Sequence, residues 1–154
     1  MKKILLAVDN TKGSERAVQT VASWTKAFRP EAVLLLNVQR LFGLSKIGEA
    51  LESDQDIEEV TNALENSEQM DQFNSASAKI LSHFTHILEQ SGYANITALI
   101  KQGHPAEQIL STAKDENVDL IVVGSHGARL HTLLIGSVSR EVANTADISV
   151  LIAR

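Results

Sequence analysis

The chain has 154 residues, 44% of them hydrophobic, and a formal net charge of −5. This length and hydrophobic content exclude a disordered or collagen-like chain and predict a single domain, residues 1–154, with one sizeable core. The negative charge argues against a nucleic-acid surface, which needs a basic patch. Cysteine is absent, which excludes disulfides and thiolate metal sites and fits a reducing compartment.

The first element predicted in chain order is a strand, Ile4–Val8. The two lysines before it superficially resemble the start of a signal peptide, but the apolar run ends at Asp9 and lacks a small-residue cleavage site. No apolar run in the chain approaches the roughly 18 residues of a membrane span. We therefore interpret Ile4–Val8 as a strand of the mature protein, and we expect a cytoplasmic protein without membrane insertion.

A helix is predicted next, followed by a second strand, Ala32–Val38. Ser14 is a candidate N-cap for this helix, and its apolar stripe comprises Ala17, Val18, Val21, Ala22, Thr25 and Phe28. Both strands are continuous apolar runs rather than alternating ones. Such runs are typical of strands buried on both faces of a parallel sheet.

An acidic excursion, Leu41–Gln69, separates the second strand from the next long helix. Glu49 to Asp71 contains nine carboxylates and no lysine or arginine. A sparse apolar stripe hints at one short helix inside it, formed by Ile57, Val60 and Leu64. Connections of this length are usually functional or mobile, and we expect a solvated, mobile segment with weak hydrogen-exchange protection.

After this excursion, helices and strands alternate regularly. The remaining predicted strands are Ile96–Ile100, Val118–Val123 and Ile148–Ile152. Pro105 is suited to the first position of a helix, with His104 as its cap or start. Three further helices are predicted from apolar stripes. The first stripe, which ends near Gly92, comprises Met70, Phe73, Ala76, Ile80, Leu81, Phe84, Ile87 and Leu88. The second comprises Ile109, Leu110 and Ala113, and the third comprises Val138, Val142, Ala143 and Ala146. The order β-α-β-α-β-α-β-α-β predicts an α/β fold, a doubly wound open parallel five-stranded sheet with helices on both faces.

The stretch GSHGARLHTLLIGS, Gly124 to Ser137, is the main candidate for a ligand site. Ligands of open α/β sheets bind beyond the carboxyl ends of strands, where both Gly124 and Asp9 are predicted to lie. Gly136 and Ser137 precede a helix, whose unpaired N–H groups favour an anion. Glycines also let backbone N–H groups approach phosphate oxygens. From this spacing alone, phosphate binding and simple turn formation both stay open.

Other chemistries find less support in the sequence. No GxGxxG follows the first strand and GxxxxGK[ST] is missing, which argues against a Rossmann dinucleotide site and a P-loop NTPase. GSVSR is not the G-x-S-x-G of a hydrolase, so Ser137 is not assigned as a nucleophile. His83 and His86 lie three residues apart on a helix, but no third metal ligand is visible. We interpret them as surface or core histidines and expect no metal site.

Four segments carry a resemblance to a known family. KKILLAVD, LLLNV, DLIVVGSHG and IGSVSREVANTADISVLIAR, spread over nearly the whole chain, resemble the universal stress proteins. The fixed positions of the motif G-x2-G-x9-G-[ST] in nucleotide-binding members are matched by Gly124, Gly127, Gly136 and Ser137. Only eight residues, 128–135, separate Gly127 from Gly136 where the motif has nine, which bears on phosphate geometry rather than on the fold. Arg129 and His131 are candidate donors to compensate.

The resemblance implies the strand order 3-2-1-4-5 and an ATP site. Its residues would be Ala7, Val8 and Asp9 on the adenine and ribose side, Val38 at the adenine through its backbone, Val123 and Gly124 beside the ribose, His126 and Gly127 at the phosphates, and Gly136, Ser137, Val138 and Ser139 holding the phosphates. Asp9 has an alternative role as a turn-forming residue before the first helix.

The resemblance also implies a function. We expect a cytoplasmic, ATP-binding universal stress protein with a regulatory role in the stress response, with or without Mg²⁺ on the nucleotide. A homodimer is expected along the last strand, ISVLIAR, because an apolar edge strand is a template for pairing.

Any hydrolysis of ATP should be slow, because no clear general base or metal cage is visible. Two alternatives stay open: a dimeric interaction module that has lost nucleotide binding, favoured by the shortened loop, and an ATP-using hydrolase or transferase, for which Asp9 with bound Mg²⁺ is the best support.

Overall fold

The computed structural model describes residues 1–40, 68–125 and 135–154. Its strands are β1 (Lys3–Ala7), β2 (Ala32–Gln39), β3 (Ile96–Gln102), β4 (Leu120–Gly124) and β5 (Ser149–Ala153), and its helices are α1 (Lys12–Ala22), α4 (Glu68–Gln90), α5 (Pro105–Asp115) and α6 (Ser137–Thr145). The strands form one sheet, paired parallel throughout, in the order β3-β2-β1-β4-β5. The predicted fold class and the strand order implied by the resemblance are therefore confirmed.

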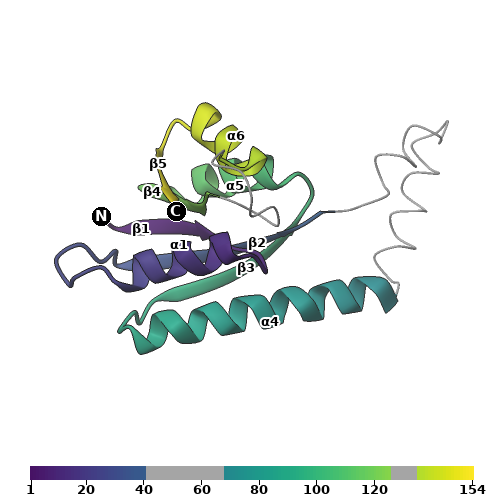
Figure 1. Cartoon of the computed structure of the whole chain (residues 1–154), viewed down its shortest axis with the longest axis horizontal. Helices are drawn as coiled ribbons and strands as arrows, with labels where there is room; N and C mark the ends of the chain where they lie inside the picture. The colour runs from purple at the N-terminus through teal and green to yellow at the C-terminus, as the bar shows by residue number, and fades with distance from the viewer. Residues whose placement is uncertain (41–67, 126–134) are drawn as a thin grey trace.

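Helices cover both faces of the sheet (Figure 1). Neighbouring strand residues enter opposite cores: Leu6 packs into the core under α1 and α4, whereas Leu5 packs into the core under α5 and α6. The central strands are therefore buried on both sides, and this removes the need for polar residues at alternate positions. That is the physical reason for the continuous apolar runs in the sequence.

The bounds of α1 differ from the prediction at both ends. Its N-cap is Thr11, whose hydroxyl accepts the Ser14 N–H at 3.5 Å, so Ser14 lies inside the first turn and is not the cap. The helix ends at Ala22: the Ser23 hydroxyl takes the Thr20 carbonyl, and the Trp24 N–H donates to the Val21 carbonyl in a tighter turn. Phe28, predicted on the inward stripe, follows this end and is 72% exposed.

Other predicted elements are found close to their expected places. Residues 41–67 of the predicted acidic excursion lie outside the described residues, and α4 already begins at Glu68. Pro105 takes the first position of α5 after the N-cap His104, as predicted. Within the described ranges, no helix is long and apolar enough to cross a membrane.

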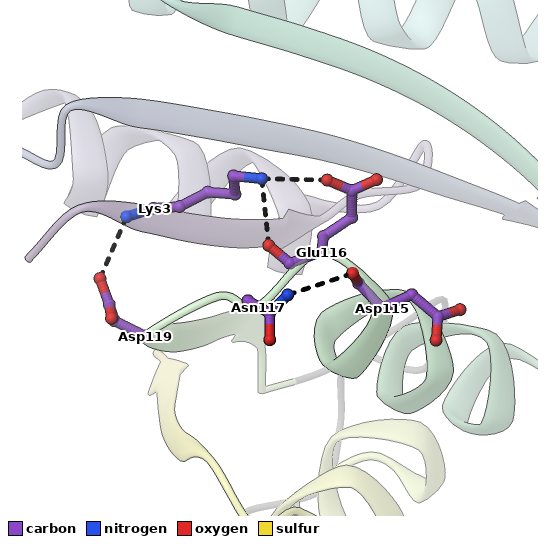
Figure 2. Close-up of polar contacts among 5 residues, drawn as sticks. All are labelled: Lys3, Asp115, Glu116, Asn117 and Asp119. Atoms are coloured by element: carbon purple, nitrogen blue, oxygen red, sulfur yellow. Dashed lines mark hydrogen bonds and ion pairs between the residues drawn. The ribbon is translucent and has the colours of Figure 1, made fainter.

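Polar contacts join β1 to the start of β4 at the amino end of the sheet (Figure 2). Asp119 Oδ2 accepts the backbone N–H groups of Lys2 at 2.5 Å and Lys3 at 3.1 Å. The Lys3 ammonium bonds the side chain and the carbonyl of Glu116, each at 3.0 Å. The backbone N–H groups of Lys3 and Lys2 lower the pKa of the Asp119 carboxyl, because both stabilise its charged form.

We expect Asp119→Asn to lower the free energy of unfolding at neutral pH, since a neutral amide is a weaker acceptor than a carboxylate. The folded-state pKa of Asp119 lies below its ordinary value of 3.8. Its stabilising effect is therefore present above that value and is lost as the pH falls through the folded-state pKa. Urea unfolding from neutral to acid pH should show the variant converging on the wild type. A difference that stays constant over this range contradicts the assignment.

Candidate functional site

The strand order reverses between β1 and β4. From β1 the chain crosses to β2 and β3 on one side, whereas β4 and β5 lie on the other. Crossovers that diverge in this way leave an opening at the carboxyl ends of the strands, and open α/β sheets bind ligands there. The sequence prediction placed Asp9 and Gly124 at this edge, and the ends of β1 and β4 do lie there.

Gly124, the last residue of β4, lies directly against the first turn of α1. A Cβ at Gly124 would lie 2.4 Å from both the carbonyl carbon and the carbonyl oxygen of Gly13. Only glycine permits this approach of one backbone to another. Gly124 thus has a packing role of its own, and its place beside a ribose stays a prediction.

Asp9 follows β1, is exposed, and has one carboxylate oxygen fully engaged by the protein. Oδ1 accepts the Thr11 N–H at 3.0 Å, the Thr11 hydroxyl at 2.5 Å and the Ser14 hydroxyl at 2.6 Å. The Asp9 N–H in turn donates to Ser14 Oγ at 2.8 Å. Asp9 therefore does form the turn before the first helix that was proposed as its alternative role. Oδ2 has no hydrogen bond to any described residue, so a ligand role for Asp9 would use this oxygen.

β2 extends beyond the end of β1, and just past that end the Asn37 side chain of β2 takes the place of a backbone hydrogen bond between the two segments. The Val8 N–H still donates to the Leu36 carbonyl, so in a regular parallel ladder the Val8 carbonyl would accept the Val38 N–H. The buried Asn37 side chain donates Nδ2 to that carbonyl at 2.7 Å. The Val38 N–H points to the same side of β2 as the Leu36 carbonyl, makes no bond to Val8, and is therefore a candidate donor to a ligand. The sequence reasoning missed Asn37, although a single polar residue inside LLLNV was a signal.

Two groups of α6 that were predicted to hold phosphates already bond within the protein. The N–H of the N-cap, Gly136, donates to the Ser125 carbonyl at 2.6 Å. The hydroxyl of the buried Ser139 donates to the Gly124 carbonyl at 2.6 Å. These bonds fix the start of α6 against the end of β4, so both residues position the helix end.

Other donors of α6 remain available. The backbone N–H groups of Ser137, Val138 and Ser139 form the first helical turn, and none has a partner in the described part of the chain. Ser137 is exposed and its hydroxyl is likewise free there. Unpaired N–H groups at a helix start favour an anion, so this helix end can accept one.

The remaining residues predicted for the ligand site fall into two groups. Three of them have side chains that pack into the cores, so only their backbone could meet a ligand, and the others lie outside the described residues. Ala7 and Val123 pack into the core under α5 and α6, and Val8 packs into the core under α1 and α4. Their side chains therefore point into the protein at the edge where a ligand would bind. His126 and Gly127, with the candidate donors Arg129 and His131, lie outside the described residues.

Three histidines of the described residues bear on the expectation that the chain has no metal site. His104 Nδ1 lies 3.7 Å from Glu141 Oε1 and links the start of α5 to α6. His83 and His86 are exposed on α4, and His86 Nε2 lies 3.0 Å from Gln90 Nε2. Within residues 1–40, 68–125 and 135–154, no three His, Cys, Asp or Glu side chains are placed to hold a metal ion together.

Together these features define a doubly wound α/β protein, in which the first N–H groups of α6 have no partner among the described residues at the topological switch point. Residues 1–154 match the universal stress protein family. The chain is 31% identical to Universal stress protein MJ0577 from Methanocaldococcus jannaschii, over 99% of this chain and 94% of that protein. It is 29% identical to Universal stress protein YxiE from Bacillus subtilis, over 99% and 98% of the two chains. The chain therefore belongs to the universal stress protein family.

Solved structures agree with this assignment. The MJ0577 structure superposes with a TM-score of 0.72 at 29% identity, over 99% of this chain and 94% of that chain. A universal stress protein in complex with cAMP has a TM-score of 0.64 at 19% identity, over 99% and 96%. A universal stress protein family protein from Arabidopsis thaliana with AMP bound has a TM-score of 0.61 at 20% identity, over 99% and 91%. At the last two identities the likeness establishes the shared fold alone.

Proposed function

We propose that this protein binds an adenine nucleotide, ATP in the first place, and acts as a cytoplasmic regulator in the stress response. Membership of the universal stress protein family supports this proposal. Two proteins of the same fold also hold adenine nucleotides, cAMP in one and AMP in the other. In this chain the phosphates would lie against the first turn of α6, and the base would lie against the Val38 backbone.

The amino end of α6 is the observation that carries the proposal. Its first three N–H groups are unpaired in the described part of the chain, and its first turn contains no acidic residue. The N-cap, Gly136, has no side chain to occupy the space in front of them. The helix dipole adds partial positive charge at this point. A phosphate would pair these donors, and any Mg²⁺ would be held mainly through the phosphates and water.

The test is purification in native buffer, followed by denaturation and analysis of the released nucleotide, with calorimetric titration of the ligand-free protein by ATP. We expect an adenine nucleotide to co-purify or to bind at millimolar concentration or below. If neither occurs, the eight-residue separation between Gly127 and Gly136 has disabled the loop, and the interaction-module alternative stands. Turnover of labelled ATP at an enzymatic rate would instead support a hydrolase or transferase.

We also propose a homodimer along β5. This strand is at the edge of the sheet, and its apolar residues Val150, Leu151 and Ile152 are only half-buried in one chain. A lysine on an edge strand opposes pairing with another edge, so Ser149→Lys should weaken the dimer in sedimentation experiments. Thr97→Lys, on the opposite edge strand β3, is the matched control and should leave it intact. A wild-type monomer at micromolar concentration would contradict this interface.

A further inference from the structure

We infer that pairing of two copies along β5 raises the affinity of the α6 helix end for the nucleotide, so that dimer formation and nucleotide binding regulate each other. This coupling rests on the proposed function, because it joins the proposed phosphate position to the proposed dimer edge. It goes beyond both, since it assigns a physical connection between them.

One peptide unit joins the end of β5 to the start of α6. The Ser125 N–H donates to the Ala153 carbonyl of β5 at 2.7 Å. The carbonyl of the same peptide unit, that of Gly124, accepts the Ser139 hydroxyl of α6 at 2.6 Å. The next carbonyl, that of Ser125, accepts the N–H of the N-cap Gly136 at 2.6 Å. Because hydrogen bonds that share a peptide unit polarise one another, the position of Ala153 bears directly on the position of the α6 donors.

β5 and α6 are also joined at their other ends. α6 ends at Thr145 and β5 begins at Ser149, so only residues 146–148 connect them. Between these two connections, Val142 of α6 and Val150 of β5 pack into the same core. A displacement of β5 would therefore displace α6 at both ends.

β5 is the element that a second copy would hold in place. It is bonded to β4 on one side, and no described strand lies on its other side. Ala153 turns its carbonyl toward β4, so in a parallel ladder Ile152 turns its N–H and carbonyl to the free edge. A strand bonded on one side only opens locally at a lower free-energy cost than a central one.

The sign of the coupling follows from this position. A partner strand bonded to Ile152 would keep the adjacent Ala153 carbonyl against the Ser125 N–H. The first turn of α6 would then stay in place for the phosphates, so pairing favours nucleotide binding. Because such coupling is reciprocal, the nucleotide must favour pairing by the same factor.

The test compares the ATP affinity of monomer and dimer by calorimetric titration. Ser149→Lys lies at the opposite end of β5 from Ala153, roughly 13 Å away, so it acts on the site through the dimer alone. We expect this variant to bind ATP about fivefold or more weakly than the wild type. Thr97→Lys adds the same charge on β3 and should keep the wild-type affinity. In sedimentation experiments, saturating ATP should lower the dissociation constant of the wild-type dimer by the same factor of about five or more.

Ser139→Ala tests the connection itself, with Ser139 as a positioning residue. In this background, Ser149→Lys should change the ATP affinity by about twofold or less, because the Gly124 carbonyl no longer holds α6. Ser111→Ala is the matched control. It removes a hydroxyl of the neighbouring helix α5, where Ser111 bonds the Gln108 carbonyl at 3.3 Å, and should leave the fivefold difference unchanged.

The outcomes separate the coupling from the proposed function. A folded, monomeric Ser149→Lys protein with the wild-type ATP affinity overturns the coupling alone, as does a wild-type dimer whose dissociation constant ATP leaves unchanged. A wild type that stays monomeric with ATP overturns the coupling and the β5 interface, whereas a wild type that binds no ATP overturns the proposed function as well. If Ser149→Lys does not fold, titration of the wild type well below and well above the concentration at which it dimerises supplies the same comparison.

Discussion

Replacing Gly124 with alanine should lower the free energy of unfolding by about 3 kcal/mol. The added Cβ would lie 2.4 Å from the carbonyl carbon and oxygen of Gly13. These are backbone atoms of the first turn of α1, so no side-chain rotation relieves the contact and the helix must move away from β4. Thermal unfolding followed by circular dichroism should show a midpoint roughly 6–12 °C lower.

Gly136→Ala is the matched control for this change. It adds the same methyl group at another glycine near the site, but the backbone there has φ −59° and ψ 157°, which any residue adopts. We expect a loss of about 1 kcal/mol or less, from the poorer N-cap. Equal melting temperatures for Gly124→Ala and the wild type would show that α1 does not need this close approach to β4.

Gly136→Val should weaken ATP binding by about tenfold to a hundredfold while leaving the fold intact. Its negative φ gives no conformational reason for unfolding. The β-branched side chain would stand beside the unpaired N–H groups that begin at Ser137 and would obstruct a phosphate. Losing one charge-assisted hydrogen bond costs about 1.5–3 kcal/mol, which corresponds to that range of affinity. Ser137→Ala removes only a hydroxyl and should weaken ATP binding less.

The matched control for Gly136→Val is Ala143→Val. Ala143 is exposed on the same helix but away from its amino end, so a β-branched residue there should leave ATP affinity unchanged. Circular dichroism and urea unfolding establish that each variant is folded before titration. A folded Gly136→Val protein that binds ATP as tightly as the wild type would place the phosphates elsewhere and refute the assignment to α6.

The strands were predictable from the sequence because burial on both faces makes each one a continuous apolar run. ILLAV and AVLLLNV coincide with β1 and β2 to within a residue or two at each end. The start of α5 was equally clear, because Pro105 fits the first helical position and no interior one. The strand order came from the family resemblance, since periodicity carries no information on which strands are neighbours.

Helix ends were less predictable, because several residues compete for the same role. Thr11 and Ser14 are both good N-caps, and only the folded chain shows that Thr11 caps α1 while Ser14 bonds Asp9. Phe28 continues the helical spacing of α1 in sequence, yet it is exposed, because the helix ends at Ala22 and the chain turns more tightly at Trp24 before the stripe is complete.

The sequence by itself determined the class of the fold, the strands and most of the helices, and its glycine motif predicts a site at the switch point. The tertiary structure decided how this edge of the sheet is built. Gly124 must be glycine because Gly13, far away in the chain, packs against it. Asn37 bonds the Val8 carbonyl, which the Val38 N–H would meet in a regular ladder. These roles depend on distances between segments that only the folded chain brings together, and the pattern of residues along the sequence does not contain those distances.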